Sequence, residues 1–149
     1  MYNCFDIAKK FIELSKNENE IMTPMKLLKL TYMAHGYYLA FTDKPLFSNK
    51  VEAWKYGPVI PDLYHIVKRT DFSGNDFHFI EMFSNTKLSK GDDKFIESVW
   101  NAYKRFDGGQ LSSKTHEEET PWAKTYKGQF STKIDNNLIK EYYKTKING

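Results

Sequence analysis

The stretch from Met25 to Ala40 constrains the fold more than any other part of the sequence. Thr23 can accept a backbone hydrogen bond as a helix N-cap, and Pro24 suits the first helical position, where its missing N–H is no loss. At helical spacing, two adjacent rows carry the side chains that would face neighbours: Leu28, Tyr32, His35 and Leu39, and beside them Leu27, Thr31, Ala34 and Tyr38. Because an apolar arc this wide needs several packing partners, we expect a central, buried helix.

Further helices are predicted before and after this one. Apolar periodicity and capping signals place them at residues 3–15, 61–69, 89–106, 111–116, 121–126 and 135–146. Pro61 suits a first helical position, and Ser89 and Asp135 suit N-caps. We expect Gly108 and Gly109 to end the helix at 89–106 in a left-handed conformation.

Extended structure is predicted only between the helices. Residues 51–54 are short enough for a strand or a helical turn, and Gly57 and Ile60 should be extended because each precedes a proline. A turn is expected at residues 73–76, and the apolar run 77–83 fits a buried strand as well as a helical segment. We therefore expect a mainly α, single compact multi-helix domain over residues 1–149, with at most a small two- or three-stranded β element.

Composition excludes several classes of protein. Aromatic residues make up 16% of the 149 positions, which excludes a disordered chain. The one cysteine, Cys4, cannot form an internal disulfide, so a cytoplasmic setting is expected. The longest uncharged run, from Leu30 to Thr42, is shorter than the ~20 residues that span a bilayer, and charged residues from position 6 onward interrupt any signal-peptide core. No association with a membrane is expected.

The four histidines show no metal-ligand spacing. They are His35, His65, His78 and His116. They stand far apart in the sequence, whereas a zinc site needs three or four convergent ligands. We expect His35, on the apolar arc of the central helix, to be a neutral, hydrogen-bonded core residue. Neither a metal nor another cofactor is predicted.

His116 stands in the most reactive-looking segment, because Glu117 and two further glutamates follow it. A histidine beside carboxylates can act as a general base, but it needs a nucleophile, and Cys4 is predicted on a core face. The sequence also contains no nucleophile elbow, phosphate-binding loop or zinc-peptidase motif. We expect no catalytic residue and no enzymatic activity. A hydrolase centred on His116 would lose its activity, but not its fold, in the substitution His116→Ala.

Three groups of basic residues make a stand-alone nucleic-acid-binding regulator the alternative function. They are Lys26 with Lys29, Lys68 with Arg69, and the lysines at positions 124, 127, 133, 140, 144 and 146. A phosphate-binding face needs several of these on one surface, with stacking aromatics or arginines beside them. The chain has two arginines and a net charge of +3, so nucleic acid is the less favoured partner. Such a regulator would bind DNA with an affinity that falls with salt.

The three tryptophans differ in their surroundings. Trp100 lies on the apolar face of the helix predicted at 89–106, so we expect it in the core. Trp54 and Trp122 each stand beside a proline-containing turn, and aromatic residues in irregular segments are typical anchors of protein interfaces. The sequence leaves a core role and an interface role equally open for these two.

Three segments resemble a known family in their order and spacing. They read MKLLKLTYMAHGYYLA (25–40), EAWKYGPVIPDLY (52–64), and LSSKTH followed by PW (111–122). Together they are similar to the Panacea domain, the family of SocA-like antitoxins and phage-associated GepA-like proteins, over residues 5–143. The block at 53–64 is the most specific part, and residues 72–90 carry no motif of the family.

The resemblance implies a bacterial or prophage-encoded antitoxin that neutralises a toxin encoded beside it. The partner would be the cognate toxin protein, which the antitoxin either blocks by binding or delivers to a cellular protease. The family is described as one domain paired with many unrelated toxins and sometimes fused to a DNA-binding module. Since 149 residues accommodate only the domain itself, direct protein–protein binding is the expected mechanism. The resemblance brings no catalytic residue with it.

The same motifs supply candidates for partner binding or for the scaffold beneath it: Trp54, Tyr56, Gly57, Pro58, Tyr64, His116, Pro121 and Trp122. In this hypothesis the prolines stiffen a turn that presents aromatic rings, His116 bonds to that turn or caps a helix, and Trp122 packs alongside. Either these residues build the scaffold while other surfaces select the toxin, or the toxin contacts them directly. The toxin's identity and the oligomeric state stay open at this point.

Overall fold

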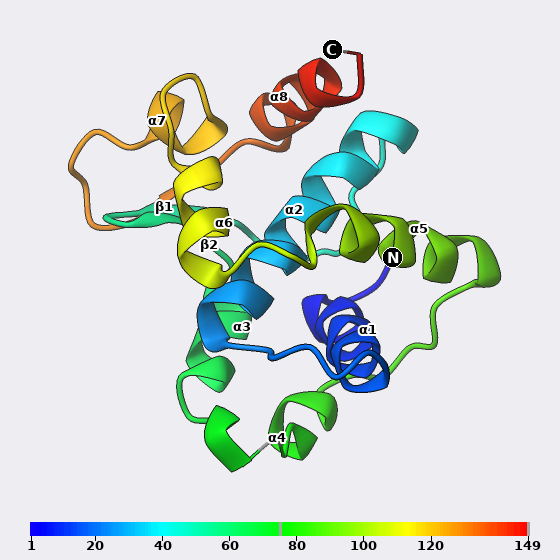
Figure 1. The fold of residues 1–149 in the computed structure, drawn as a ribbon. Helices are drawn as coiled ribbons and strands as arrows, with labels where there is room; N and C mark the ends of the chain where they lie inside the picture. Colours follow the sequence, from blue (N-terminus) through cyan, green and yellow to red (C-terminus); the bar gives the residue numbers. More distant parts are fainter. Residues whose placement is uncertain (75, 149) are drawn as a thin grey trace.

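Helix α2 (Pro24–Thr42) runs through the middle of the molecule, as its wide apolar arc predicts (Figure 1). The computed structural model describes residues 1–74 and 76–148. The other helices are α1 (Cys4–Asn17), α3 (Pro61–Val67), α4 (His78–Glu81), α5 (Lys90–Tyr103), α6 (Gly108–Thr115), α7 (Pro121–Thr125) and α8 (Asn136–Asn148), with a 3-10 turn, η1 (Phe72–Gly74). α1, α5, α6 and α8 all pack against α2.

The helix starts are set by local caps. The Thr23 hydroxyl accepts a hydrogen bond from the backbone N–H of Lys26 at 3.3 Å, and the Ser89 hydroxyl accepts one from Asp92 at 3.2 Å. The Asp135 carboxylate accepts one from Asn137 at 2.7 Å. Each bond satisfies an N–H that the first turn of a helix leaves without a partner, which confirms these three predicted starts.

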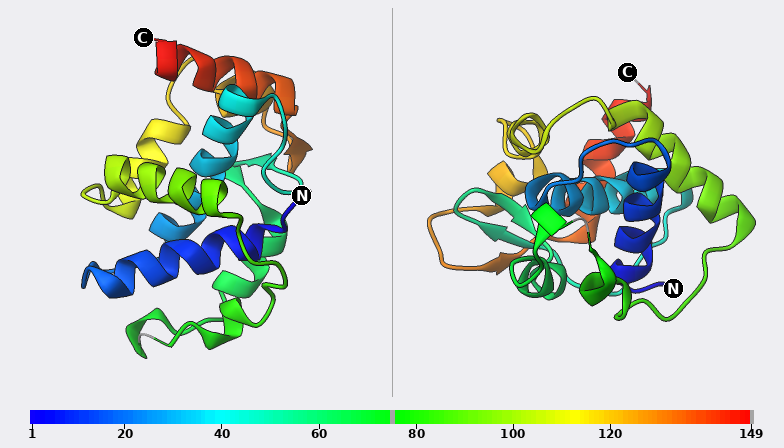
Figure 2. Two further views of the ribbon diagram at one scale, coloured as in Figure 1. Left: turned by 90° about the vertical axis from the view of Figure 1, so that its right-hand side faces the viewer. Right: turned by 60° about the horizontal axis from the view of Figure 1, so that its bottom comes forward.

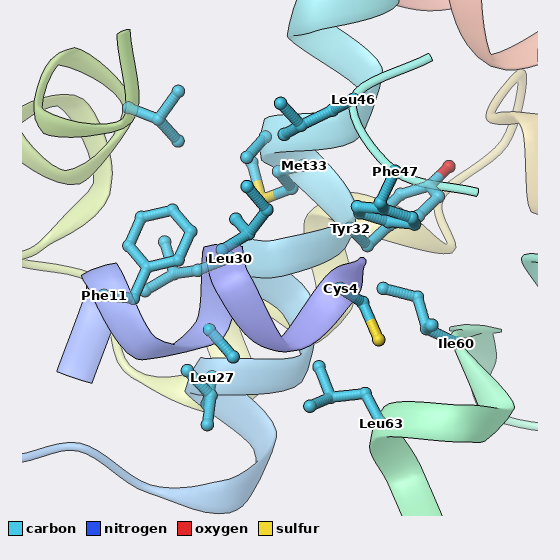
Figure 3. Close-up of a cluster of buried hydrophobic side chains, with 14 of the residues drawn as sticks. Cys4, Phe11, Leu27, Leu30, Tyr32, Met33, Leu46, Phe47, Ile60 and Leu63 are labelled. Carbon is cyan, nitrogen blue, oxygen red and sulfur yellow. The ribbon is translucent and has the colours of Figure 1, made fainter. Parts of the chain in front are cut away.

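A large part of the core lies where α1 and α3 meet the N-terminal half of α2 and the segment after α2 that contains Leu46 and Phe47 (Figure 3). Its members include Cys4, Phe11, Leu27, Leu30, Tyr32, Met33, Leu46, Phe47, Ile60 and Leu63. Trp100 of α5 is also completely buried, as predicted, and its indole N–H donates to the Glu18 carboxylate at 2.8 Å. Burial raises the pKa of the Cys4 thiol, so the free cysteine is an inert core residue.

A small antiparallel sheet completes the fold. Its strands are β1 (Glu52–Trp54), β2 (Gly57–Val59) and β3 (Thr132–Lys133), in the order β2-β1-β3. Residues 51–54 therefore contribute a strand and not a helical turn. α2 and α6 pack against β2, and the sheet lies on the opposite side of the molecule from α5 (Figure 2, right). This mainly helical fold with one three-stranded sheet in the described residues confirms the predicted class.

The prediction for Gly108 and Gly109 was wrong. These residues do not end α5; they begin α6, and neither has a positive φ. The Asp107 carboxylate caps the new helix by accepting a hydrogen bond from the backbone N–H of Gln110. In return, the backbone N–H of Asp107 donates to the side-chain oxygen of Gln110 at 2.9 Å. A Cβ atom at residue 108 would lie 2.8 Å from the Met25 Cβ, so glycine is needed there for the close approach of α6 to α2.

Two short helical pieces follow α3, η1 at Phe72–Gly74 and α4 at His78–Glu81, so the apolar run at 77–83 contributes a helical turn and not a strand. Of the turn predicted at residues 73–76, Asn75 lies outside the described residues. In the described ranges every helix is too short or too polar to cross a lipid bilayer.

Candidate protein-binding surface

The β1–β2 hairpin is the centre of the candidate site. Ala53 pairs with Pro58 and Trp54 pairs with Gly57, so Lys55 and Tyr56 form the tip. Gly57 lies in a strand but has a φ of +126°, a conformation that L residues rarely adopt. Gly57 is part of a strand, as the prediction of an extended residue requires. Its positive φ, which the sequence does not predict, additionally favours glycine at this position.

The outer face of this sheet carries Trp54. Ala53 is buried, so strand alternation turns Glu52 and Trp54 to the opposite, outer face, where Val59 and Lys133 also lie because each pairs with Glu52. The indole N–H of Trp54 donates to Glu52 Oε1 at 2.9 Å. Trp54 is thus half-buried and held in place by its neighbour two residues before it.

Helix α3 extends this outer face. Pro61 begins α3, and the preceding residue Ile60 is extended, as predicted. The ring of Tyr64 meets Trp54 edge to face, with centroids 5.0 Å apart, and the exposed His65 lies 6.5 Å from the same tryptophan. The proline-stiffened connection therefore places Tyr64 and Trp54 together, as the turn hypothesis requires.

Lys29 holds the hairpin from behind. Its ammonium donates to the carbonyl oxygen of Pro58 at 2.8 Å, and the side chain is buried beneath the sheet. Burial lowers the pKa of Lys29 to about 8. This contact ties β2 to the central helix, and the sequence does not reveal it, because the spacing of Lys29 also fits an exposed basic group.

Lys26, the other member of that group, is also buried, and its ammonium donates to the carbonyl oxygen of Lys104 at 2.6 Å. Lys26 and Lys29 therefore do not form a basic surface that the alternative function, a nucleic-acid-binding regulator, could use. A lysine side chain can bury its long aliphatic stem while its ammonium donates a hydrogen bond to a carbonyl oxygen. Residue spacing does not reveal this arrangement.

His116 packs against the hairpin but does not bond to it. It is the C-cap residue of α6, and its ring contacts the site of Gly57, where a Cβ would lie 3.6 Å from His116 Nδ1. Nδ1 is buried with no hydrogen-bond partner among the described residues. Glu117, Glu118 and Glu119 are exposed. The predicted position at a helix cap is confirmed, and the hydrogen bond to the turn is not formed.

Trp122 joins α7 to the hairpin. Thr120 caps α7 with Pro121 at its first position, and the indole N–H of Trp122 donates to the backbone oxygen of Trp54 at 2.5 Å. The Trp122 ring stacks on Tyr126 with centroids 5.0 Å apart, and meets His116 edge to face at 5.6 Å. Two tryptophans 68 positions apart in sequence are thus part of one cluster.

The candidate residues divide by exposure. Gly57, Pro58 and Pro121 are buried, Trp54, Tyr64, His116 and Trp122 are half-buried, and Tyr56 is 71% exposed. Phe130 is 91% exposed, and the pairing of Thr132 with Ala53 carries it toward the hairpin tip.

The exposed and half-buried residues on this side of the sheet and α3 are called the hairpin surface: Trp54, Lys55, Tyr56, Tyr64, His65, Lys68, Phe130 and Lys133. Phe130 escaped the sequence reasoning because nothing local links it to the hairpin.

In the part of the chain that the structure describes, no group of three His, Cys, Asp or Glu side chains could hold a metal ion. His35 is buried, its Nε2 lies 3.2 Å from Asn136 Oδ1, and its ring stacks on Phe47. Burial lowers the pKa of His35 to about 4, so it is the neutral core histidine that the sequence predicts.

Comparison with known proteins gives a consistent result. A family model described as "Antitoxin SocA-like, Panacea domain" matches residues 27–123, a range that contains every predicted site residue. Antitoxin SocA of Caulobacter vibrioides (strain NA1000 / CB15N) is 28% identical over 111 residues, which are 66% of this chain and 56% of that protein. The chain thus spans only about half of the length of this curated relative. No solved structure matches.

Proposed function

Because the chain belongs to the SocA-like Panacea domain family, we propose that it is the antitoxin of a toxin–antitoxin pair and neutralises its toxin by direct binding at the hairpin surface. In this proposal residues 1–149 act as one domain in the cytoplasm, without catalysis. Blocking of the toxin and its delivery to a protease would both begin with this binding step.

One observation carries the choice of surface: exposed aromatic side chains stand on a hairpin that is held from behind. Tyr56 at the tip is 71% exposed, while Lys29 and Trp122 each donate a hydrogen bond to the backbone of the two strands beneath it. Tyrosine supplies a large contact area with few rotatable bonds, and a preformed support lowers the entropy lost on binding. This combination is typical of a binding anchor.

We also propose a division of roles among the motif residues. Gly57, Pro58, Pro121 and Trp122 contribute to the support, and the exposed rings of Tyr56 and Phe130 offer the contact area. Trp54 lies between the two groups, with its backbone oxygen in the support and its ring on the outer face. Substitution of Tyr56 therefore tests binding with less risk of unfolding than substitution of either tryptophan.

The test is co-expression with the product of the neighbouring small open reading frame. That product should be toxic alone and harmless with the wild-type chain. The double variant Tyr56→Ala/Phe130→Ala should lose this rescue and weaken binding by at least about 30-fold, with an unchanged melting temperature. The control is Phe41→Ala, a residue 61% exposed near the end of α2, which should keep full rescue.

A neighbour that is harmless alone, or that stays toxic beside the wild-type chain, contradicts the antitoxin proposal itself. Full rescue by the double variant leaves the antitoxin role intact but contradicts the proposed surface. The two failures therefore have different signatures.

A further inference from the structure

We infer that the hairpin surface accepts an acidic protein segment, with Lys55, Lys68 and Lys133 facing its carboxylates. The inference rests on the proposed function for the identity of the partner as the toxin, and it adds the chemistry by which that partner is recognised. Three observations support it: the unpaired lysines, the neutralised acid among them, and the way two of the lysines cover tyrosine rings.

Among the described residues five lysines form ion pairs with acids, and Lys55, Lys68 and Lys133 are not among them. Lys10 lies 3.0 Å from Asp93, and Lys104 lies 2.7 Å from Glu18. In the described residues no carboxylate forms an ion pair with Lys55, Lys68 or Lys133, and all three are exposed. Their positive charge is thus available to a partner.

The acid nearest to these lysines on the sheet is already neutralised. Glu52 pairs with Lys133 across the strands, but its carboxylate lies 3.1 Å from Lys50 Nζ and accepts the indole N–H of Trp54. A carboxylate with two such partners attracts a third cation only weakly. Exposed lysines around apolar rings with no free acid among them favour association with a negatively charged surface.

Two rings on this surface, those of Tyr56 and Tyr64, are covered by ammonium groups, which favours carboxylates over nucleic-acid bases as their partners. Lys55 Nζ lies 5.4 Å from the centre of the Tyr56 ring, and Lys68 Nζ lies 5.5 Å from that of Tyr64. Binding of single-stranded nucleic acid uses open ring faces on which bases stack. An ammonium above a ring instead leaves its free N–H groups pointing outward, where a carboxylate can accept them.

A titration with two probes of matched charge tests the recognition chemistry without any toxin. The probes are a glutamate-rich peptide and a single-stranded oligonucleotide, followed through backbone amide shifts in NMR spectra. The inference expects the peptide to shift residues 54–56, 64–68 and 132–133 at low salt, and the shifts to disappear at 0.5 M salt. Peptide shifts elsewhere, or stronger binding of the oligonucleotide at the same residues, overturn it.

A charge-reversal variant tests the same chemistry on the toxin. The triple variant Lys55→Glu/Lys68→Glu/Lys133→Glu should lower the association rate at low salt by at least about tenfold and remove most of its salt dependence. The control changes the net charge equally on another face, at three exposed lysines outside any ion pair: Lys87→Glu/Lys90→Glu/Lys94→Glu. It should stay within about twofold of the wild type.

Equal effects of the two triple variants would overturn the inference, because net charge alone would then explain them. Peptide binding at the predicted residues together with no binding of the neighbour's product would contradict the proposed antitoxin function and leave the preference for acidic segments standing. A failure of the inference and a failure of the proposed function are thereby distinguished.

Discussion

The helical core and the hairpin surface place tryptophan in two different environments. Trp100 is completely buried against α2 and donates its indole N–H to Glu18, whereas Trp54 and Trp122 keep part of each ring in solvent. At the hairpin the indole N–H groups bond to Glu52 and to the backbone of Trp54. In the core the tryptophan mainly removes apolar area from water, while at the hairpin it fixes the orientation of a surface. The same residue type thus serves stability in one region and presentation in the other.

The largest effect should come from removing the core tryptophan. We expect Trp100→Ala to lower the free energy of unfolding by about 3–5 kcal/mol, because a large cavity forms in a packed interior. Urea denaturation measures this loss. The matched change at the hairpin surface, Phe130→Ala, should stay within about 0.5 kcal/mol, since that ring is 91% exposed. Similar losses in the two variants would contradict the contrast between the regions.

A second effect, confined to the core, depends on pH. The pKa of His35 is about 4 in the folded protein, below the ordinary value of 6.5, because burial disfavours the imidazolium. Between pH 6.5 and 4 the unfolded chain binds a proton that the folded chain does not, so the free energy of unfolding falls as the pH falls, by about 3 kcal/mol from pH 7 to pH 4.

Urea denaturation across this pH range checks the effect of His35. His35→Gln should lose most of the decrease, and His65→Gln, at the exposed histidine of the hairpin surface, should keep it. A decrease of the same size in wild type and His35→Gln would show that another group controls acid stability.

The smallest effect should come from the hairpin backbone. Gly57→Ala forces an L residue to a φ of +126° and brings its Cβ within 3.1 Å of Lys29 Nζ, so we expect a loss of about 1–3 kcal/mol. Thermal melting measures it. Gly91→Ala is the control, because nothing lies within 4 Å of a Cβ there and alanine favours the helix. If Gly57→Ala keeps wild-type stability and toxin binding, the hairpin needs no such rigid turn.

The helix starts could be predicted because their determinants are close in sequence. Thr23 with Lys26 and Ser89 with Asp92 are each three residues apart. The error at Gly108 also has a local origin: Asp107 and Gln110 form a capping box that starts a helix, and this signal outweighs the tendency of a glycine pair to end one. Of the candidate site, the sequence motifs predict the proline-stiffened turn and the residues Trp54, Tyr56 and Trp122, and the structure adds that the turn belongs to a hairpin.

Contacts between distant segments decided the rest. The bond from Trp122 to Trp54, the burial of Lys29 under Pro58 and the position of Phe130 beside the hairpin link residues far apart in the chain. Periodicity could not distinguish a solvated lysine from a buried one, because the difference lies in what packs over the helix. The burial of Trp54 also depends on that packing, and the structure shows this side chain half-buried.

The sequence by itself determined a mainly helical chain with a central α2, its caps and its proline-stiffened turn, since each rests on backbone hydrogen bonds and steric limits within a few residues. Only the tertiary structure decided which charges are buried, which rings stay in water and which lysines lack an acid. Those properties depend on which elements meet in space, and burial changes the free energy of a charge or a ring more than any local preference does.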